Sequence, residues 1–163
     1  MGKVTDARCL PSKTTTWLTP RWILDALAKF DLDPCCPPEM PWRTARRMIQ
    51  QPEDGLAAEW AGRVWLNPPY GRGMEKWMEK MAKHRNGIAL VFARTDTQWF
   101  HNHVVGHAWS VLFLKRRVRF CYPDGTMGGS PAAPSMLLSY SQQDANILHY
   151  LTGRENWGAH IRL

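Results

Sequence analysis

The chain has 163 residues and a net charge of +7, from 21 lysines and arginines against 14 aspartates and glutamates. Hydrophobic residues make up 44% of it and charged residues 21%, proportions that are ordinary for a folded protein and exclude a disordered one. The length predicts one domain over residues 1–163, with residues 1–16 as a polar arm. No stretch approaches the roughly 20 apolar residues of a membrane span. The excess of basic over acidic residues favours a polyanionic partner such as nucleic acid.

The four cysteines are Cys9, Cys35, Cys36 and Cys121. Their spacing is that of neither a zinc site nor a disulfide framework. We therefore expect reduced thiols in a cytoplasmic protein and no metal. The oligomeric state is left open between a monomer and a weak dimer.

The first half of the chain predicts short elements that end at prolines. Thr19 is the expected N-cap of an amphipathic helix over residues 20–30, with a proline at its first position. Residues 31–35 read as the end of a strand followed by a loop, and residues 44–50 as a short helix. An apolar run over residues 63–66 stands before two prolines, which is typical of a strand.

The second half alternates apolar runs with amphipathic segments. It predicts helices over residues 74–84, 97–105 and 143–151, and strands over residues 88–93, 110–114, 118–122 and 135–140. Strands that alternate with helices indicate an α/β fold with a mostly parallel sheet. Ligands of such sheets bind beyond the carboxyl ends of the strands. The loops after Leu32 and Leu66 are therefore the expected places for chemistry.

Nine tryptophans are many for this length. Trp22, Trp65 and Trp77 are expected in the core, because they fall within apolar runs or on apolar helix faces. Trp17 and Trp99 are the better candidates for walls of a site.

The run from Asn67 to Tyr70, Asn-Pro-Pro-Tyr, is the most specific feature of the sequence. Pro68 and Pro69 fix the backbone and end the strand, so they set a rigid turn. Such a turn can hold the Asn67 side-chain oxygen and the Pro68 carbonyl in one orientation, where two acceptors meet the two hydrogens of an amino group. Tyr70 adds a flat face on which a base can stack.

At this point the sequence resembles the phage-associated Dam-type DNA N6-adenine methyltransferases. Five segments carry the resemblance in the family's order: Trp17–Pro20, Leu32–Cys36, Asp54–Trp60, Asn67–Tyr70 and Arg117–Phe120. The resemblance implies a compact Rossmann-like class I methyltransferase fold, mostly parallel with an antiparallel late strand. It also implies S-adenosylmethionine as cofactor, an adenine in DNA as substrate, and a bacterial or phage-infected host cell.

The resemblance also assigns residues to roles. The implied catalytic residues are Asn67, Pro68, Pro69, Tyr70 and Phe120. The implied cofactor-binding residues are Trp17, Thr19, Pro20, Asp33, Pro34, Cys35, Asp54, Leu56 and Asn67. Basic side chains near the expected loop ends are candidates for DNA phosphates: Arg72, Arg94, Lys115, Arg116, Arg117 and Arg119.

Two departures from the family pattern keep alternatives open. The loop after Asp33 lacks a Gly-x-Gly motif, and the segment from there to Asn67 is shortened to about one βαβ unit. Asp33 and Asp54 are also plain candidates for turn-capping residues. The same catalytic loop would serve the N4 amine of cytosine, an adenine in RNA or a glutamine amide, and a catalytically silent DNA-binding protein of this fold is the alternative from another class.

Overall fold

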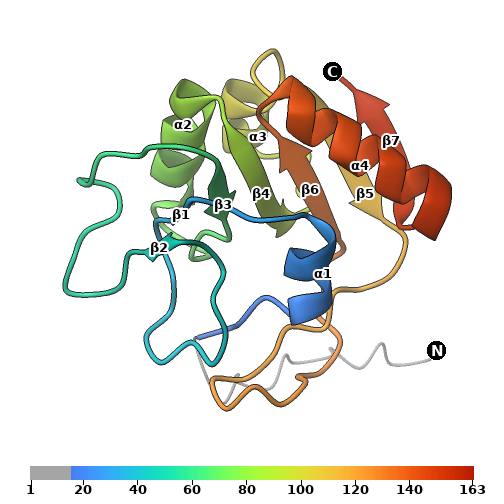
Figure 1. Cartoon of the computed structure of the whole chain (residues 1–163). Coiled ribbons are helices and arrows are strands. Elements are labelled where there is room, and N and C mark those ends of the chain that lie inside the picture. The colour runs from blue at the N-terminus through green and yellow to red at the C-terminus, as the bar shows by residue number, and fades with distance from the viewer. Residues whose placement is uncertain (1–15) are drawn as a thin grey trace, which may run out of the picture.

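The computed structural model describes residues 16–163, in which seven strands form one sheet in the order β2-β1-β3-β4-β6-β5-β7 (Figure 1). The expected polar arm therefore lies outside the described residues except for Thr16, and so does Cys9. The strands are β1 (Leu32–Asp33), β2 (Arg47–Met48), β3 (Val64–Leu66), β4 (Gly87–Phe92), β5 (Ser110–Leu114), β6 (Ser135–Ser139) and β7 (Gly158–Arg162). The helices are α1 (Arg21–Ala26), α2 (Met74–His84), α3 (Gln98–His103) and α4 (Gln142–Glu155).

The sheet is divided into a parallel half and an antiparallel half. β2, β1, β3 and β4 pair in parallel. β6 runs against both β4 and β5, and β7 runs against β5. The α/β class is confirmed, but three of the six pairings are antiparallel, because β7 joins the expected late antiparallel strand.

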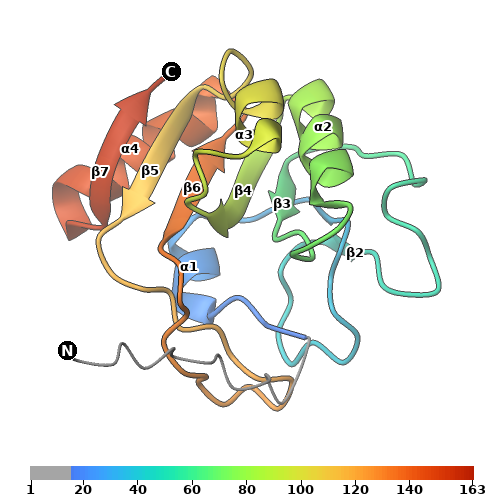
Figure 2. The same cartoon turned by 180° about the vertical axis from the view of Figure 1, so that it is seen from behind.

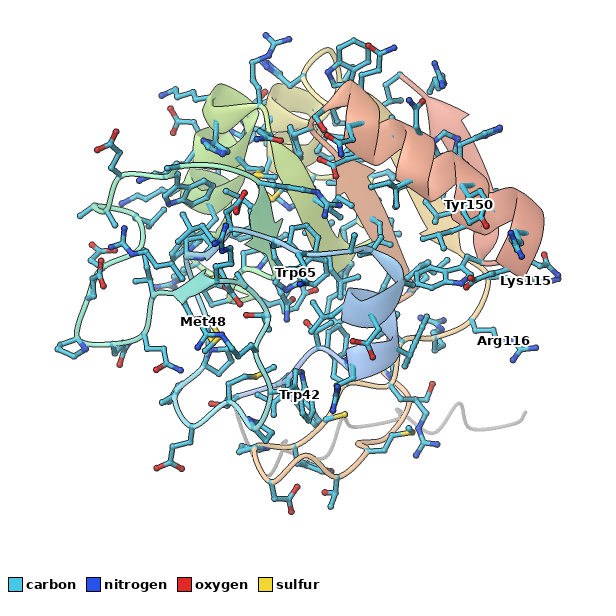
Figure 3. All side chains as sticks on the ribbon, viewed as in Figure 1. Trp42, Met48, Trp65, Lys115, Arg116 and Tyr150 are labelled. Atoms are coloured by element: carbon cyan, nitrogen blue, oxygen red, sulfur yellow. The ribbon has the colours of Figure 1, made fainter. Side chains whose placement is uncertain are left out.

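Helices cover both faces of the sheet, as the two opposite views show (Figures 1 and 2). α2 and α3 pack with Leu66, Val91 and Leu138 on one face, and α1 and α4 pack with Trp65 and Leu90 on the other. Successive strand residues such as Trp65 and Leu66 thus point to opposite layers, as the pleat requires. Trp65 lies at the centre of the molecule and is fully buried (Figure 3).

The first half of the chain departs from the sequence-based expectations at two places. The predicted helix over residues 20–30 ends at Ala26, since Ala28 adopts a left-handed φ of 63°. The predicted helix over residues 44–50 is wrong, because this segment pairs with β1 and forms β2. Ile49 N–H donates to the Asp33 carbonyl at 2.8 Å, so tertiary pairing outweighs local helix propensity.

The second half departs at two further places. Residues 118–122 were predicted as a strand, but only Cys121 forms isolated bridges, to Leu18 and Met127. β7 is not among the predicted strands, because its five residues are partly or fully exposed and form no apolar run. The helices α2 and α4 and the strands β3 to β6 lie where the patterns predicted them, within a few residues.

The described residues contain no group of three or more acidic, histidine or cysteine side chains placed to hold a metal. Cys35, Cys36 and Cys121 are free thiols. In residues 16–163 no helix combines the length and the apolar character that crossing a membrane requires.

Candidate active site

Asn67 begins the loop that follows β3, at the carboxyl end of the parallel half of the sheet. Its backbone carbonyl accepts from the Cys35 thiol at 3.2 Å, and its side-chain nitrogen donates to the Thr19 hydroxyl at 3.3 Å. Its side-chain oxygen Oδ1 is buried and has no hydrogen-bond partner. A buried acceptor without a donor costs free energy, so this atom marks the point at which a donor would be bound.

Tyr70 presents a partly exposed ring, with 40% of its surface open, three residues further on. One side of the ring rests on Phe92, with 4.2 Å between centroids and 21° between planes. Phe92 meets Phe120 edge-to-face at 6.4 Å. Phe120 is buried and contacts Phe92. The aromatic residue on which Tyr70 stacks is therefore Phe92, at the end of β4.

Asp33 ends β1 and is buried, and its carboxylate is held by two donors. Thr44 Oγ1 donates to it at 2.6 Å, and Cys35 N–H donates at 3.1 Å. Burial raises its pKa from 3.8 to about 6, while the two hydrogen bonds act in the opposite direction. The contact with Cys35 N–H is a turn-capping contact. Turn capping was the alternative to cofactor binding that the sequence left open for Asp33.

The thiol of Cys35 stays neutral in this environment. Burial, and next the neighbouring Asp33 carboxylate, raise its pKa well above its usual value of 9.0. A thiol held in this form is a poor nucleophile.

The loop after β1 touches the segment that carries Asp54. Gly55 packs so closely on Pro34 that a Cβ atom there would lie 1.7 Å from the Pro34 carbonyl oxygen. Asp54 accepts from Leu56 N–H at 2.8 Å, again a turn contact, and its side chain is exposed. The Leu56 carbonyl accepts from Lys80 of α2 at 2.6 Å, which anchors this turn to the helix that follows the Asn67–Tyr70 loop.

The segment from Trp17 to Pro20 lies beside the same loops. Thr19 and Pro20 are buried, and Thr19 contacts Asn67 instead of capping α1, which has Pro20 as its N-cap. Trp42 donates from its ring nitrogen to the Thr19 carbonyl at 3.2 Å, in the loops below the sheet (Figure 3). Trp17 packs on Tyr122 and Gly128 of the late loop.

The six basic residues proposed for DNA are all exposed, but they form two groups. Arg72 lies two residues after Tyr70 in the loop that follows β3, and Arg94 lies two residues after Phe92 at the end of β4. Lys115, Arg116, Arg117 and Arg119 follow β5 and line a separate cleft together with Trp22. Trp22 was expected in the core, yet it is half exposed.

Asn67 contacts the segments of Thr19 and Cys35 directly, the Asp54 segment packs on Pro34, and the late segment joins through Phe120 and Phe92. Sequence reasoning missed three supporting residues: Thr44, Phe92 and Lys80. Thr44 lies in the segment that was predicted as a helix, and Phe92 and Lys80 read as ordinary strand and helix positions. Only the tertiary contacts reveal their roles.

Comparison with known proteins identifies one family. The sequence model of one family, described as DNA N-6-adenine-methyltransferase (Dam), matches residues 7–156. No curated protein and no solved structure matches the chain.

Proposed function

Because this chain belongs to the DNA N-6-adenine-methyltransferase (Dam) family, we propose that it transfers a methyl group from S-adenosylmethionine to the N6 amine of an adenine flipped out of DNA. The observation that carries this proposal is the buried, unpaired Oδ1 of Asn67 beside the exposed ring of Tyr70. An adenine amino group would supply the missing donor, and its base would supply the stacking partner.

The chain's part in the reaction is to position the target and shape its charge. A base inside a duplex is out of reach, so it leaves the stack before it is modified. Asn67 Oδ1 and the Pro68 carbonyl accept the two amino hydrogens, which favours a pyramidal nitrogen with its lone pair aimed at the incoming methyl group. Pro69 holds the turn rigid, Tyr70 stacks on the base, and Phe92 and Phe120 support Tyr70. Such positioning lowers the barrier without a covalent intermediate.

The residues around Asn67 fit a cationic cofactor. S-Adenosylmethionine supplies an electrophilic methyl group on a sulfonium. The buried Asp33 carboxylate has no ion-pair partner within residues 16–163, so a nearby positive charge would compensate its burial. Asp54 keeps an exposed carboxylate for an amino group. The proposed contacts are Trp17, Thr19, Pro20, Asp33, Pro34, Cys35, Asp54, Leu56 and Asn67.

Arg72 and Arg94 are the proposed phosphate contacts nearest the flipped base. Both are exposed at the ends of strands that carry the aromatic row, and neither forms an ion pair within the described residues. A free guanidinium next to the base pocket can bind the flanking phosphates and fix the register of the strand.

The test is methyl transfer to unmethylated DNA, followed by mass spectrometry of the nucleosides. We expect N6-methyladenine, and we expect Asn67→Ala to lower its formation by about 100-fold or more. Asn146→Ala is the matched control, because Asn146 is exposed on α4 and bonds only Arg162 in the contacts of the described chain. N4-methylcytosine would instead identify cytosine as the base.

A catalytically silent protein is the outcome that would contradict the proposal. The region between β1 and β3 contains β2 and no α-helix, which is the feature that favours this alternative. Calorimetric titration with S-adenosylmethionine separates the two. Absence of cofactor binding by the folded protein, with DNA affinity intact, would identify a silent DNA-binding protein.

A further inference from the structure

A cleft separate from the catalytic loop opens where α1, the end of β5 and the turn between α4 and β7 meet. Its volume is about 440 Å³, which lies within the range of sites for small ligands. Lys115, Arg116, Arg117 and Arg119 line it together with Trp22 and Trp157. Lys115 and Arg116 extend from the edge of the molecule below Tyr150 of α4 (Figure 3).

The positive charge of this cleft is not neutralised. Lys115 donates to the Asn156 side-chain oxygen at 3.5 Å, and Arg117 and Arg119 donate to the carbonyls of Ala132 and Gly128, each at 2.9 Å. Neutral oxygens orient these cations but leave their charge in place. Across residues 16–163 none of the four cations forms an ion pair.

The cleft also holds an exposed indole. Trp22 is 50% exposed, and it meets Trp157 edge-to-face with 4.9 Å between ring centroids. Trp157 is itself held by its ring nitrogen, which donates to Glu155 at 2.8 Å. Glu155 lines the cleft too, so its carboxylate is engaged by a neutral donor while the basic side chains remain in excess. A large apolar ring fixed among free cations is an arrangement suited to a ligand with both phosphates and flat rings.

We propose that this cleft binds a single-stranded segment of the substrate DNA beside the target adenine, with one base stacked on Trp22 and the phosphates at Lys115, Arg116 and Arg117. In a duplex each base is covered on both faces by its neighbours, so an indole reaches only base edges. In a single strand the faces are open, and cationic grooves with aromatic platforms bind such strands.

A chain of ring contacts links the side of this cleft to the proposed catalytic loop. Arg119 precedes Phe120, Phe120 contacts Phe92, and Phe92 supports Tyr70. The proposal places the adenine at Tyr70 and a neighbouring part of the same strand at Trp22. That the strand is a methylation substrate rests on the proposed function, and it implies a preference for single-stranded or locally opened DNA.

Binding is measured by fluorescence anisotropy with a labelled oligothymidine and no cofactor, so methyl transfer does not enter the readout. We expect Trp22→Ala to weaken binding about tenfold and Trp22→Phe to retain most of it. Trp109→Ala is the matched control, because Trp109 is 42% exposed but precedes β5, at the opposite end from the cleft. Thermal unfolding of each variant confirms that it is folded.

The salt dependence gives a second readout. Arg116→Ala is expected to lower the slope of log affinity against log salt by about 0.7, the value for one phosphate of a single strand. Arg162→Ala should leave the slope unchanged, since Arg162 pairs with Ser110 at the far end of β5.

Equal affinities of Trp22→Ala and Trp109→Ala for the oligothymidine would overturn the proposal. It would also be overturned if a DNA duplex bound as tightly as the single strand and its binding depended on Trp22 to the same extent. Tighter binding of oligouridine would overturn the assignment to DNA. If the wild-type protein shows this binding pattern but forms no methyladenine, the binding role of the cleft is supported and the proposed reaction is wrong.

Discussion

Tyr70 stacks on Phe92, and 40% of the residue's surface is exposed. Desolvation raises the pKa of its phenol, so the hydroxyl stays neutral and its charge has no part in the reaction. We therefore expect Tyr70→Phe to retain most activity and Tyr70→Ala to lower kcat/KM by about 10- to 100-fold, the loss of one base-stacking contact. Steady-state methylation kinetics measure both, with Tyr150→Ala on α4 as an exposed tyrosine outside the site. Equal losses in the Phe and Ala variants would assign the effect to the hydroxyl.

Asp33 makes the stability of the protein depend on pH. Burial raises its pKa from 3.8 to about 6, so the folded state holds a proton that the unfolded state releases between these values. Stability from this group is thus present at acidic pH and is lost as pH rises toward 6 and above. The shift corresponds to about 3 kcal/mol in order of magnitude, so Asp33→Asn should raise the free energy of unfolding at pH 7.5 by up to about that amount.

Urea unfolding at pH 7.5 and pH 4 checks this expectation. Near pH 4 the variant and the wild type should differ little, because the folded protein then carries a protonated Asp33. A similar change at both values would instead point to the hydrogen bonds from Thr44 and Cys35.

Among the elements, β3 and β4 pair closely because Gly87 lacks a side chain. Its φ is +138°, and a Cβ atom there would lie 2.1 Å from the Val64 carbonyl oxygen. We expect Gly87→Ala to lower the free energy of unfolding by about 3 kcal/mol or more, through strain and displacement of the strand that carries the catalytic loop. Gly129→Ala is the control, since that position meets nothing within 4 Å. Equal stabilities of the two variants in urea would contradict this account.

Elements with strong local signals could be predicted from the sequence. α2 has apolar residues at helical spacing, and β4 is an uninterrupted apolar run buried between two layers. The turn over residues 67–70 could be predicted as well, since two prolines after a buried strand leave few backbone alternatives. These features depend on neighbours in the chain, and the structure has them within a few residues of their predicted positions.

The remaining elements depend on distant partners, which a local pattern does not contain. Residues 44–50 form β2 because Asp31 and Asp33 offer their carbonyls. β7 is a five-residue strand of partly or fully exposed residues that is held by β5. Trp22 fits the spacing of a core helix, but α1 turns Ile23 and Leu24 into the core and leaves Trp22 half exposed. Thr44 and Phe92 are absent from the predicted site for the same reason, because their contacts are with residues distant in the sequence.

At the scale of the whole molecule, one ion pair joins the two halves of the sheet. Arg63 stands before β3 in the parallel half, and Asp144 lies in the first turn of α4, which covers the antiparallel half. Their side chains meet at 2.7 Å, with Asp144 fully buried and Arg63 only 12% exposed. Ser141 caps α4 through the same Asp144, and the Arg63 guanidinium also lies over the Phe30 ring at 4.1 Å.

Removing one partner of such a pair leaves the other buried and uncompensated. We expect Asp144→Asn to lower the free energy of unfolding by about 3 kcal/mol, and Arg63→Met with Asp144→Asn to lose less than the sum of the two single variants. A double-mutant cycle in urea measures the coupling, which should reach at least about 1 kcal/mol. Additive losses would mean that Asp144 acts through the α4 cap alone, and the two halves of the sheet would then be joined by packing on the helices and not by charge.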